Sequence, residues 1–362
     1  METKSRKVSS FQIGATYIGV TIGAGFASGQ EVLQFFAFFG QDSFPALLLT
    51  TVMFVFFGWL VLRLGALLKA TSHREVIMHA SGKSLGVVVD IVITFFLFGS
   101  FTVMLAGAGA SVEQQFGISP LAGTLGMAVI SLVTVLFGLT GIVSAMSVLV
   151  PVMVIGVLGV FVGVQIVSPL TLQEVLAFNL PNAAVMPSWP LSAATYVSYN
   201  MLVAVAVLSP LGASAGMGRR LKDGALLGGV GLGLGILVIN LVLMSIPQSA
   251  GFPIPMIYIA NQIFPLAGVL YTMVLVMAIY TTAVGGLYGF SARVADVLGK
   301  NNFRSGVLVT VLLAVIASQV GFTILVRFLY TGLGIGGFLM LGGLLYNFFR
   351  GGLRRPRPDP VH

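Results

Sequence analysis

The sequence predicts an all-α polytopic membrane protein with ten transmembrane helices in an inverted repeat of five plus five, in which helices 1 and 6 are discontinuous. Three observations lead to this fold class. Hydrophobic residues make up 57% of the 362 residues and charged residues only 8%, which is typical of helical membrane proteins. Charged residues separate long uncharged runs, each long enough for one or two crossings of ~20 residues. Finally, glycines and polar residues interrupt the first apolar segment.

The uncharged runs give the helices in order. Most runs hold one crossing, whereas 114–173 and 224–292 are each long enough for two. The expected helices are residues 11–39, 44–69, 85–112, 120–140, 142–167, 192–217, 224–246, 266–292, 304–322 and 326–349. We therefore divide the chain into a cytoplasmic N-terminus (1–10), a first five-helix repeat (11–167), an extracellular loop (168–191), a second five-helix repeat (192–349) and a cytoplasmic tail (350–362).

The basic residues indicate the orientation. With the N-terminus inside, all of the 18 lysines and arginines except Arg327 fall in cytoplasmic segments, which is the positive-inside bias. We expect both termini in the cytoplasm, and we expect membrane lipid to be the partner of the net charge of +8. Nucleic acid is not an expected partner, because no soluble basic face presents these residues. The first apolar run lacks a small-residue cleavage site, so we expect it to be retained as helix 1.

Helix 1 contains the most informative stretch of the chain. Residues 8–39 are apolar but longer than one crossing needs, and residues 19–31 in their middle read GVTIGAGFASGQE. Non-helical backbone at membrane depth is tolerated only where protein or a water-filled cavity satisfies its polar groups. A broken helix therefore suggests a small-solute site at the membrane midplane, as in secondary transporters.

Helix 6 is the counterpart of helix 1 in the expected repeat. Its residues 192–201 read SAATYVSYNM, so hydroxyls and an amide precede the apolar half at 202–208. We expect helix 6 to be interrupted as well. This expectation depends on position and polarity only, because the two halves show no literal sequence identity.

At these residues the chain resembles a known family. The stretch GVTIGAG (19–25) resembles the unwound first helix of the leucine-transporter (LeuT) fold in the amino acid–polyamine–organocation superfamily, and GAGFASGQE (23–31) resembles YkvI-like bacterial amino-acid permeases more closely. The resemblance implies a protein of the bacterial cytoplasmic (inner) membrane that binds a small-molecule substrate, an amino acid or a related solute. It is specific at residue level in helices 1 and 8, where residues 278–286 read AIYTTAVGG.

The resemblance also implies a sodium site between helices 1 and 8. Carried over, the ligands are carbonyl and hydroxyl oxygens of Gly19, Ile22, Ala278, Thr281 and Thr282. Five neutral oxygens suit a hard monovalent cation, and helix positions i, i+3 and i+4 share one face. The alternative is that the two threonines simply donate back to the i−4 carbonyl. Helix 5 has no charged residue that could replace the ion, which favours Na⁺ as the coupling ion, with no other cofactor.

The substrate wall is predicted from the same break. Backbone N–H groups at the start of the second half-helix suit an anionic group such as a carboxylate. The expected donors are Ala24, Gly25, Phe26 and Ala27, and the facing residues of helix 6 are Tyr196, Ser198, Tyr199 and Asn200. Helix 3 offers a stripe with Phe98, Phe101, Thr102 and Met104. Phe101 is our candidate for setting the size of the bound side chain, and ordinary interhelical packing is the alternative.

Glu31 is a carboxylate deep in a predicted span, where an unpaired charge is costly. Three interpretations stay open. It hydrogen-bonds to the broken ends of helices 1 and 6, it carries a proton or contacts a cationic amine, or it pairs with Arg327 as an outer gate.

We conclude from the sequence that the protein is a sodium-coupled symporter of a small organic solute, most simply an amino acid, that works by alternating access. The alternatives are a proton-coupled permease that uses Glu31, and a solute sensor or scaffold with the same fold. An enzyme is not expected, because the chain has no cysteine and its three histidines lie outside the predicted spans, so a nucleophile and base are missing. A channel would need a symmetrical filter, which the two unlike breaks do not provide.

Overall fold

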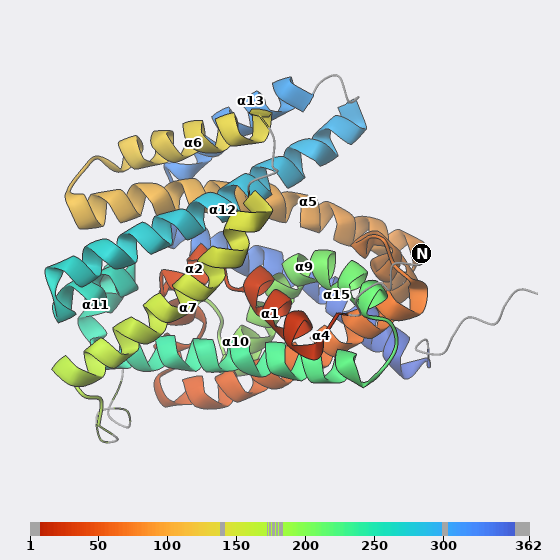
Figure 1. Ribbon diagram of the computed structural model, residues 1–362, viewed down its shortest axis with the longest axis horizontal. Helices are drawn as coiled ribbons and strands as arrows, with labels where there is room; N and C mark the ends of the chain where they lie inside the picture. The colour runs from red at the N-terminus through yellow and green to blue at the C-terminus, as the bar shows by residue number, and fades with distance from the viewer. Residues whose placement is uncertain are drawn as a thin grey trace, which may run out of the picture.

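The computed structural model describes residues 8–137, 142–171, 173, 175, 178, 180, 184–298 and 303–351, and these residues form helices and turns but no strand (Figure 1). In the first half the helices are α1 (Ser10–Thr21), α2 (Ala24–Ala27), α3 (Gln30–Phe35), η1 (Ala37–Asp42), α4 (Ser43–Leu68), α5 (His73–Phe116), α6 (Pro120–Phe137) and α7 (Ile142–Val167). In the second half they are α9 (Trp189–Ala215), α10 (Arg219–Ser245), η2 (Pro247–Gly251), α11 (Pro255–Ile263), α12 (Pro265–Leu298), α13 (Phe303–Ser318), α14 (Phe322–Leu325), η4 (Val326–Tyr330) and α15 (Thr331–Phe349).

Each of the ten predicted spans corresponds to helix in the structure. Helix 1 is divided into α1, α2 and α3, and helix 10 into η4 and α15, with the short α14 just before it. The other spans correspond to α4, α5, α6, α7, α9, α10, α12 and α13. Residues 138–140 of predicted helix 4, eight residues of the predicted loop (172, 174, 176, 177, 179 and 181–183) and the residues after 351 lie outside the described residues. Seven helical segments of the described chain are long and apolar enough to cross a membrane, and two apolar segments at 151–167 and 303–318 are shorter.

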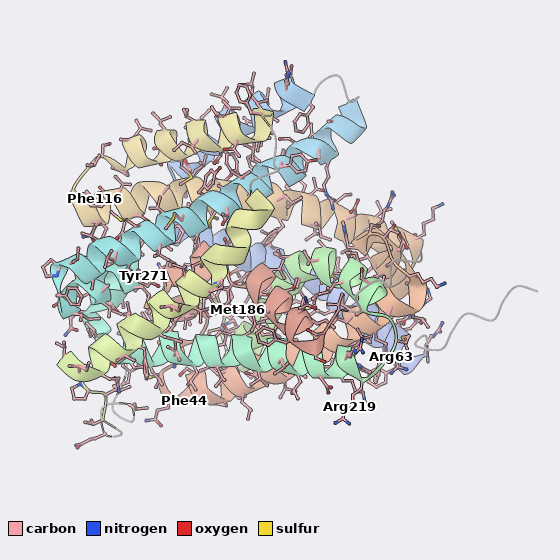
Figure 2. The ribbon with its side chains drawn as sticks, viewed as in Figure 1. Phe44, Arg63, Phe116, Met186, Arg219 and Tyr271 are labelled. Atoms are coloured by element: carbon pink, nitrogen blue, oxygen red, sulfur yellow. The ribbon has the colours of Figure 1, made fainter. Side chains whose placement is uncertain are left out.

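The outer surface of the bundle is apolar. Large side chains such as Leu48, Phe95, Ile166 and Leu312 are exposed, which a protein tolerates where lipid covers the surface. Arg63 and Arg219 lie together at one end of the bundle and Phe116 lies at the other end (Figure 2). This arrangement agrees with the predicted segregation of basic residues and with a multi-pass membrane protein. Which end faces the cytoplasm stays a prediction.

Helix 1 is broken where the sequence predicts. α1 ends at Thr21, and the following residues Ile22 (φ −74°, ψ 100°) and Gly23 (φ −106°, ψ −176°) are extended. Among the described residues, no N–H donates to the carbonyls of Gly19 or Ile22, because the residues that would continue the helical hydrogen bonds have turned away. α2 is a single turn, and Gly29, with a left-handed φ of 81°, separates it from α3.

Neighbouring elements satisfy the backbone groups on the far side of the break. The Tyr271 hydroxyl of α12 donates to the Ala27 carbonyl at 2.5 Å, and the Met256 N–H of α11 donates to the Ser28 carbonyl at 3.2 Å. The Ser28 hydroxyl donates to the Gly25 carbonyl at 2.6 Å. These contacts hold α2 and α3 against the second half of the chain. The carbonyls that end α1 are therefore the unpaired ones at this break.

The prediction that helix 6 is discontinuous is wrong. α9 runs as one helix of 27 residues from Trp189 to Ala215. Its predicted polar interruption contains no glycine, and its polar side chains have partners that do not disturb the backbone. Thr195 and Asn200 donate to carbonyls one turn earlier, those of Leu191 and Tyr196, at 2.7 and 2.9 Å. Hydroxyls and amides that bond within or beside a helix do not break it.

α9 is fixed by close packing on α4. A Cβ atom added to Gly65 of α4 would collide with the Ser209 carbonyl, and one added to Gly212 of α9 would collide with the Leu62 carbonyl. Small residues at such contacts let membrane helices approach closely. The position of α9 beside α1 and α15 is thus set by its partners.

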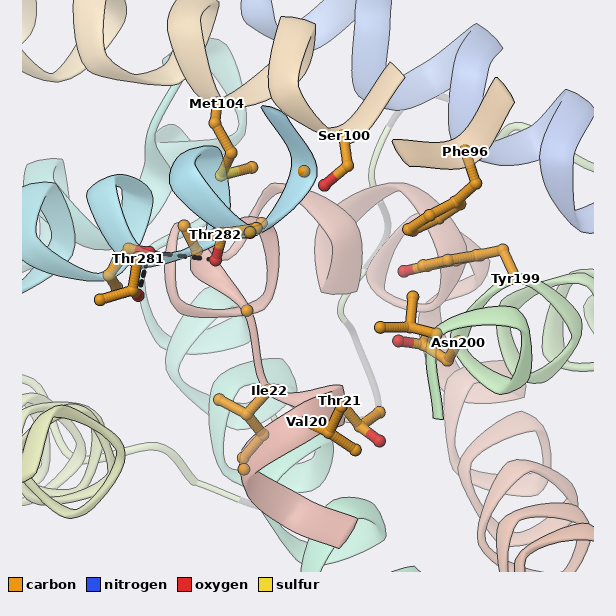
Figure 3. Close-up of a pocket in the computed structure, with 18 of the residues that line it drawn as sticks. Val20, Thr21, Ile22, Phe96, Ser100, Met104, Tyr199, Asn200, Thr281 and Thr282 are labelled. Carbon is orange, nitrogen blue, oxygen red and sulfur yellow. Dashed lines mark hydrogen bonds between the residues drawn. The ribbon is translucent and has the colours of Figure 1, made fainter. Parts of the chain in front are cut away.

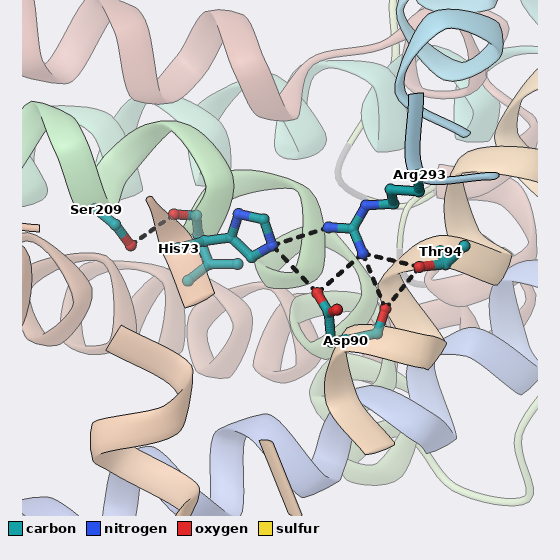
Figure 4. A network of polar contacts seen from close by, with 6 residues as sticks. His73, Asp90, Thr94, Ser209 and Arg293 are labelled. Atoms are coloured by element: carbon teal, nitrogen blue, oxygen red, sulfur yellow. Dashed lines mark hydrogen bonds and ion pairs between the residues drawn. The ribbon is translucent and has the colours of Figure 1, made fainter. Parts of the chain in front are cut away.

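A polar network joins α5 to α12 near one end of the bundle (Figure 4). Arg293 of α12 donates to the Asp90 carboxylate at 2.9 Å, to the Thr94 hydroxyl at 2.8 Å and lies 2.9 Å from the His73 ring nitrogen. His73 belongs to the first segment of α5, which is set off from the rest by Gly82 (φ 76°, ψ 171°). The network therefore ties this short segment and the long part of α5 to α12.

Candidate functional site

A cavity of about 300 Å³ lies at the break in helix 1. Its walls are the end of α1 and the Ile22–Gly25 stretch, the middle of α5, the middle of α9 and the second half of α12, with Met153 of α7 and Tyr330 of η4 completing them. Figure 3 shows side chains from α1, α5, α9 and α12 around this space. A cavity of this size at the centre of a helical bundle can enclose a small organic molecule.

Most of the predicted site residues line the cavity. Those that do are Gly19, Ile22, Ala24, Gly25, Glu31, Tyr199, Asn200, Ala278, Thr281 and Thr282. Phe26, Ala27, Tyr196, Ser198, Phe101 and Arg327 are not among its walls. The two sets are separated by helix geometry, because neighbouring positions on a helix face different directions.

The predicted sodium ligands are brought together at one side of the cavity. Gly19 and Ile22 supply the unpaired carbonyls that end α1. The Thr281 and Thr282 hydroxyls both donate to the Ala278 carbonyl, at 2.9 and 3.0 Å (Figure 3). These bonds are the ones expected of threonines that only bond back to their own helix, yet each hydroxyl oxygen keeps lone pairs that can accept a cation.

The distance between the two helices is short at this point. A Cβ atom built on Gly23 would lie 3.9 Å from the Thr282 hydroxyl oxygen, so the break of helix 1 faces the threonine pair directly. The donors in reach are neutral oxygens, which fit a monovalent hard cation. Among the described residues there is no cluster of three or more His, Asp or Glu side chains that would hold a transition metal.

Glu31 is buried, with 5% of its surface exposed, and it forms part of the cavity wall. One carboxylate oxygen, Oε2, accepts a hydrogen bond of 2.5 Å from the Tyr199 hydroxyl of α9. The other, Oε1, lies against the backbone of Gly25, where an added Cβ atom would collide with it. The absence of a side chain at residue 25 therefore gives the carboxylate room to fold back over the break.

Of the three interpretations of Glu31, the structure shows the hydrogen bond to helix 6. Arg327 is exposed in η4, with its guanidinium 5.9 Å from the centre of the Phe328 ring. No ion pair between Glu31 and Arg327 is found among the described residues. The carboxylate and the guanidinium are thus not paired in this conformation.

Tyr196 and Ser198 were predicted to line the substrate site, and the structure places them elsewhere. The Tyr196 ring packs between Phe36, at a ring distance of 4.9 Å, and Phe54, at 6.1 Å. The Ser198 hydroxyl donates to the Gly334 carbonyl of α15 at 2.7 Å. Ser198 thus belongs to the face of α9 that packs on α15, whereas the Tyr196 hydroxyl is a hydrogen-bond neighbour of the Glu31 carboxylate from behind the cavity wall. Only Tyr199 and Asn200 of the four predicted positions line the cavity.

Phe101 is fully buried and is not among the residues that line the cavity. The residues of α5 that line the cavity include Phe96, Ser100 and Met104. Their spacing of four residues marks one helix face. Of the predicted stripe of Phe98, Phe101, Thr102 and Met104, only Met104 lies on this face. Tyr330 carried no signal in the sequence, because its place depends on how η4 packs.

An aromatic stack closes the wall beside Glu31. The Tyr330 ring stacks on Tyr199 with 5.0 Å between ring centres, and on Phe96 with 6.3 Å. All three rings line the cavity. The cavity thus combines one carboxylate, three aromatic faces, a few neutral polar groups and an otherwise apolar surface.

Comparisons with known proteins agree with this architecture. The chain is 28% identical over 347 residues to the uncharacterized membrane protein YkvI of Bacillus subtilis, covering 94% of this chain and 96% of that protein. It is 33% identical over 318 residues to the uncharacterized protein YyaD of the same organism, covering 86% of this chain and 89% of that one. No protein-family model matches the chain.

Several solved transporters share the fold. Mhp1 in its inward-facing conformation matches with a TM-score of 0.60 at 14% identity, covering 97% of this chain and 81% of its own. MhsT in complex with L-phenylalanine matches with a TM-score of 0.60 at 16% identity, covering 91% and 87%. A Na⁺-coupled sialic acid symporter matches with a TM-score of 0.63 at 11% identity, covering 95% and 79%. The chain therefore has the LeuT fold that its first helix predicts.

Proposed function

Because the chain belongs to the family of YkvI and YyaD, and because its LeuT-like bundle encloses a cavity at a broken helix, we propose that it is a sodium-coupled secondary transporter of a small organic solute. The observation that carries this proposal is the break itself. It places unpaired carbonyls of α1 and the threonine pair of α12 on one wall of a cavity that is large enough for a solute. Discontinuous helices at such a site are a device of secondary transporters.

The ion is proposed from the donor set. Sodium would lie between the carbonyls of Gly19 and Ile22 and the oxygens of Ala278, Thr281 and Thr282. These oxygens line the same cavity as the solute wall, so a bound ion would stabilise the conformation in which the two helices face each other. A ligand shifts a conformational equilibrium only by such a difference in affinity. Coupling by alternating access follows if ion and solute both favour the same closed arrangement.

The solute is proposed to be an amino acid or a related amine. The cavity of about 300 Å³ is mostly apolar, which suits a compound with a hydrocarbon side chain and one or two polar groups. MhsT, whose fold this chain shares, was solved with L-phenylalanine. The buried carboxylate of Glu31 also supports a second candidate mechanism, in which this residue carries a proton and the transport is proton-coupled.

Uptake into proteoliposomes tests the proposed function. The full-length protein is reconstituted and given a panel of labelled amino acids and amines under a sodium gradient, a proton gradient or neither. We expect accumulation that requires inward-directed sodium. Accumulation driven by protons alone would favour the second mechanism. Solute binding without flux under any gradient would favour a sensor with the same fold.

A further inference from the structure

We propose that the solute is a small organic cation, a primary amine without a carboxylate of its own, and that its ammonium group binds Glu31. This inference rests on the proposed function and names its substrate class. Glu31 is the only charged side chain among the cavity walls that the structure describes. A buried carboxylate that stays ionised is stabilised by a partner of opposite charge. One of its oxygens, Oε2, already has the Tyr199 hydroxyl.

The second oxygen of Glu31 is the important one. Oε1 lies over Gly25, beside the break of helix 1, and the carboxylate also has the Tyr196 hydroxyl of α9 as a hydrogen-bond neighbour. This is the place at which the sequence predicted that N–H groups of residues 24–27 would hold the carboxylate of an amino acid. The protein's own carboxylate is there instead. A second carboxylate at the same place would be repelled by it.

The other groups of the cavity suit a cation. The side-chain amide of Asn200 donates one N–H to the Tyr196 carbonyl at 2.9 Å, so its oxygen can accept a hydrogen bond from an ammonium group. The faces of Phe96, Tyr199 and Tyr330 form the neighbouring wall, and aromatic faces attract ammonium groups. Arginine, lysine and histidine are absent from the described walls, so nothing there would neutralise a substrate carboxylate except the coupling ion.

Glycine at residue 25 fits the same interpretation. Any side chain at this position would displace the Glu31 carboxylate from the break. Gly23, two residues earlier, has no neighbour closer than 3.9 Å to its added Cβ atom. The close approach is therefore specific to Gly25 and Glu31, which together form a fixed anionic wall at the midpoint of helix 1.

Matched pairs of ligands test the proposal on the purified full-length protein in sodium buffer. The probes are 3-methylbutylamine against leucine and phenethylamine against phenylalanine, with 3-methylbutanol as the uncharged control, and the readout is the ligand-induced rise in the unfolding temperature. We expect at least one amine to bind about tenfold or more tightly than its amino acid and its alcohol. An amino acid that binds more tightly than its amine would overturn the inference.

Variants of Glu31 test whether this residue causes the preference for amines over amino acids. Glu31→Gln should weaken amine binding at least about 30-fold, as expected for the loss of one partner of a buried charge pair, whereas Glu31→Asp should keep part of it. Glu113→Gln, which removes a carboxylate outside the cavity walls, is the matched control and should bind like the wild type. Sodium-induced stabilisation of Glu31→Gln shows whether that variant is folded. Unchanged amine affinity in the folded variant would contradict the proposal.

Measurements of solute uptake distinguish a failure of this inference from a failure of the proposed function. Sodium-driven uptake of amino acids but not of amines would leave the transporter intact and refute the substrate class. Amine binding that depends on Glu31 without any flux would keep the ligand class and refute the transporter.

Discussion

α1 and α9 lie side by side, both carry polar residues at mid-height, and only one of them is broken. In α1 the chain departs from helical geometry at Ile22 and Gly23, and the carbonyls behind them are left without donors. In α9 the backbone stays helical through all of its 27 residues, and the side chains of Thr195 and Asn200 bond to its own carbonyls.

The difference teaches what breaks a membrane helix. Polar side chains do not, because they can bond within the helix or to a neighbour. In α1 the departure from helical geometry comes at Ile22 and Gly23, and the nearby Gly25 leaves room for the Glu31 carboxylate. The broken helix thus presents unpaired carbonyl oxygens at the cavity, and the continuous helix contributes Tyr199 and Asn200 to its wall.

The largest effect is expected at Gly25. Gly25→Ala places a Cβ atom where the Glu31 carboxylate lies, so solute binding should be abolished and the free energy of unfolding should fall by about 1–3 kcal/mol, as overpacking predicts. Gly23→Ala is the matched control, because its extended backbone (φ −106°) suits any residue and its added Cβ has space. Ligand titration and thermal unfolding measure both variants. Equal behaviour of the two glycines would mean that backbone freedom, and not the room for Glu31, matters here.

The next effect concerns the ion. Thr281→Ala combined with Thr282→Ala removes two of the five proposed sodium ligands, so sodium should no longer raise the unfolding temperature, which for the wild type corresponds to about 2.7 kcal/mol at 100 times the dissociation constant. Thr310→Ala is the control, since that hydroxyl also donates back to its own helix, to Gly306 at 2.7 Å, but on α13 away from the cavity. If sodium still stabilised the double variant, these threonines would not be sodium ligands and would only donate hydrogen bonds to their own helix.

A smaller and purely structural effect is expected on the packing face of α9. Ser198→Ala removes the hydroxyl that donates to the Gly334 carbonyl and should cost about 0.5–1.5 kcal/mol of stability, with solute affinity unchanged. Asn200→Ala, on the cavity face, should lower solute affinity instead. Binding curves and unfolding temperatures of the two variants give the comparison. A loss of solute affinity in Ser198→Ala would indicate that Ser198 contacts the solute.

These same residues show which features of the fold and the site could be predicted from the sequence. The ten helices and the break at Gly23 could be predicted, because charge-free length and glycine clusters are local properties of the chain. The continuity of α9 could not, since a sequence does not show that Thr195 and Asn200 find partners in their own helix. The folding of Glu31 over Gly25 is likewise a tertiary contact. Our proposal of a cationic solute depends on this contact.

The smallest effect is expected at Arg327. The experiment tests whether Glu31 pairs with Arg327 in another conformation. Arg327 is exposed and has no carboxylate partner among the described residues, so Arg327→Gln should change stability by no more than about 0.5 kcal/mol, as is usual for surface positions. Transport should also stay within about twofold of the wild type. The gate interpretation predicts a larger change in transport, because an ion pair that forms only in an outward-closed state would shift the balance between states.

The double variant Glu31→Arg with Arg327→Glu distinguishes the gate from the hydrogen-bond interpretation of Glu31 in a flux assay. If Glu31 serves α9 and the solute, the exchange recovers nothing, because an arginine cannot accept the hydrogen bond that the Tyr199 hydroxyl donates. Recovery of transport in the exchanged pair would establish the gate and would require a second conformation in which helix 1 turns its carboxylate away from α9.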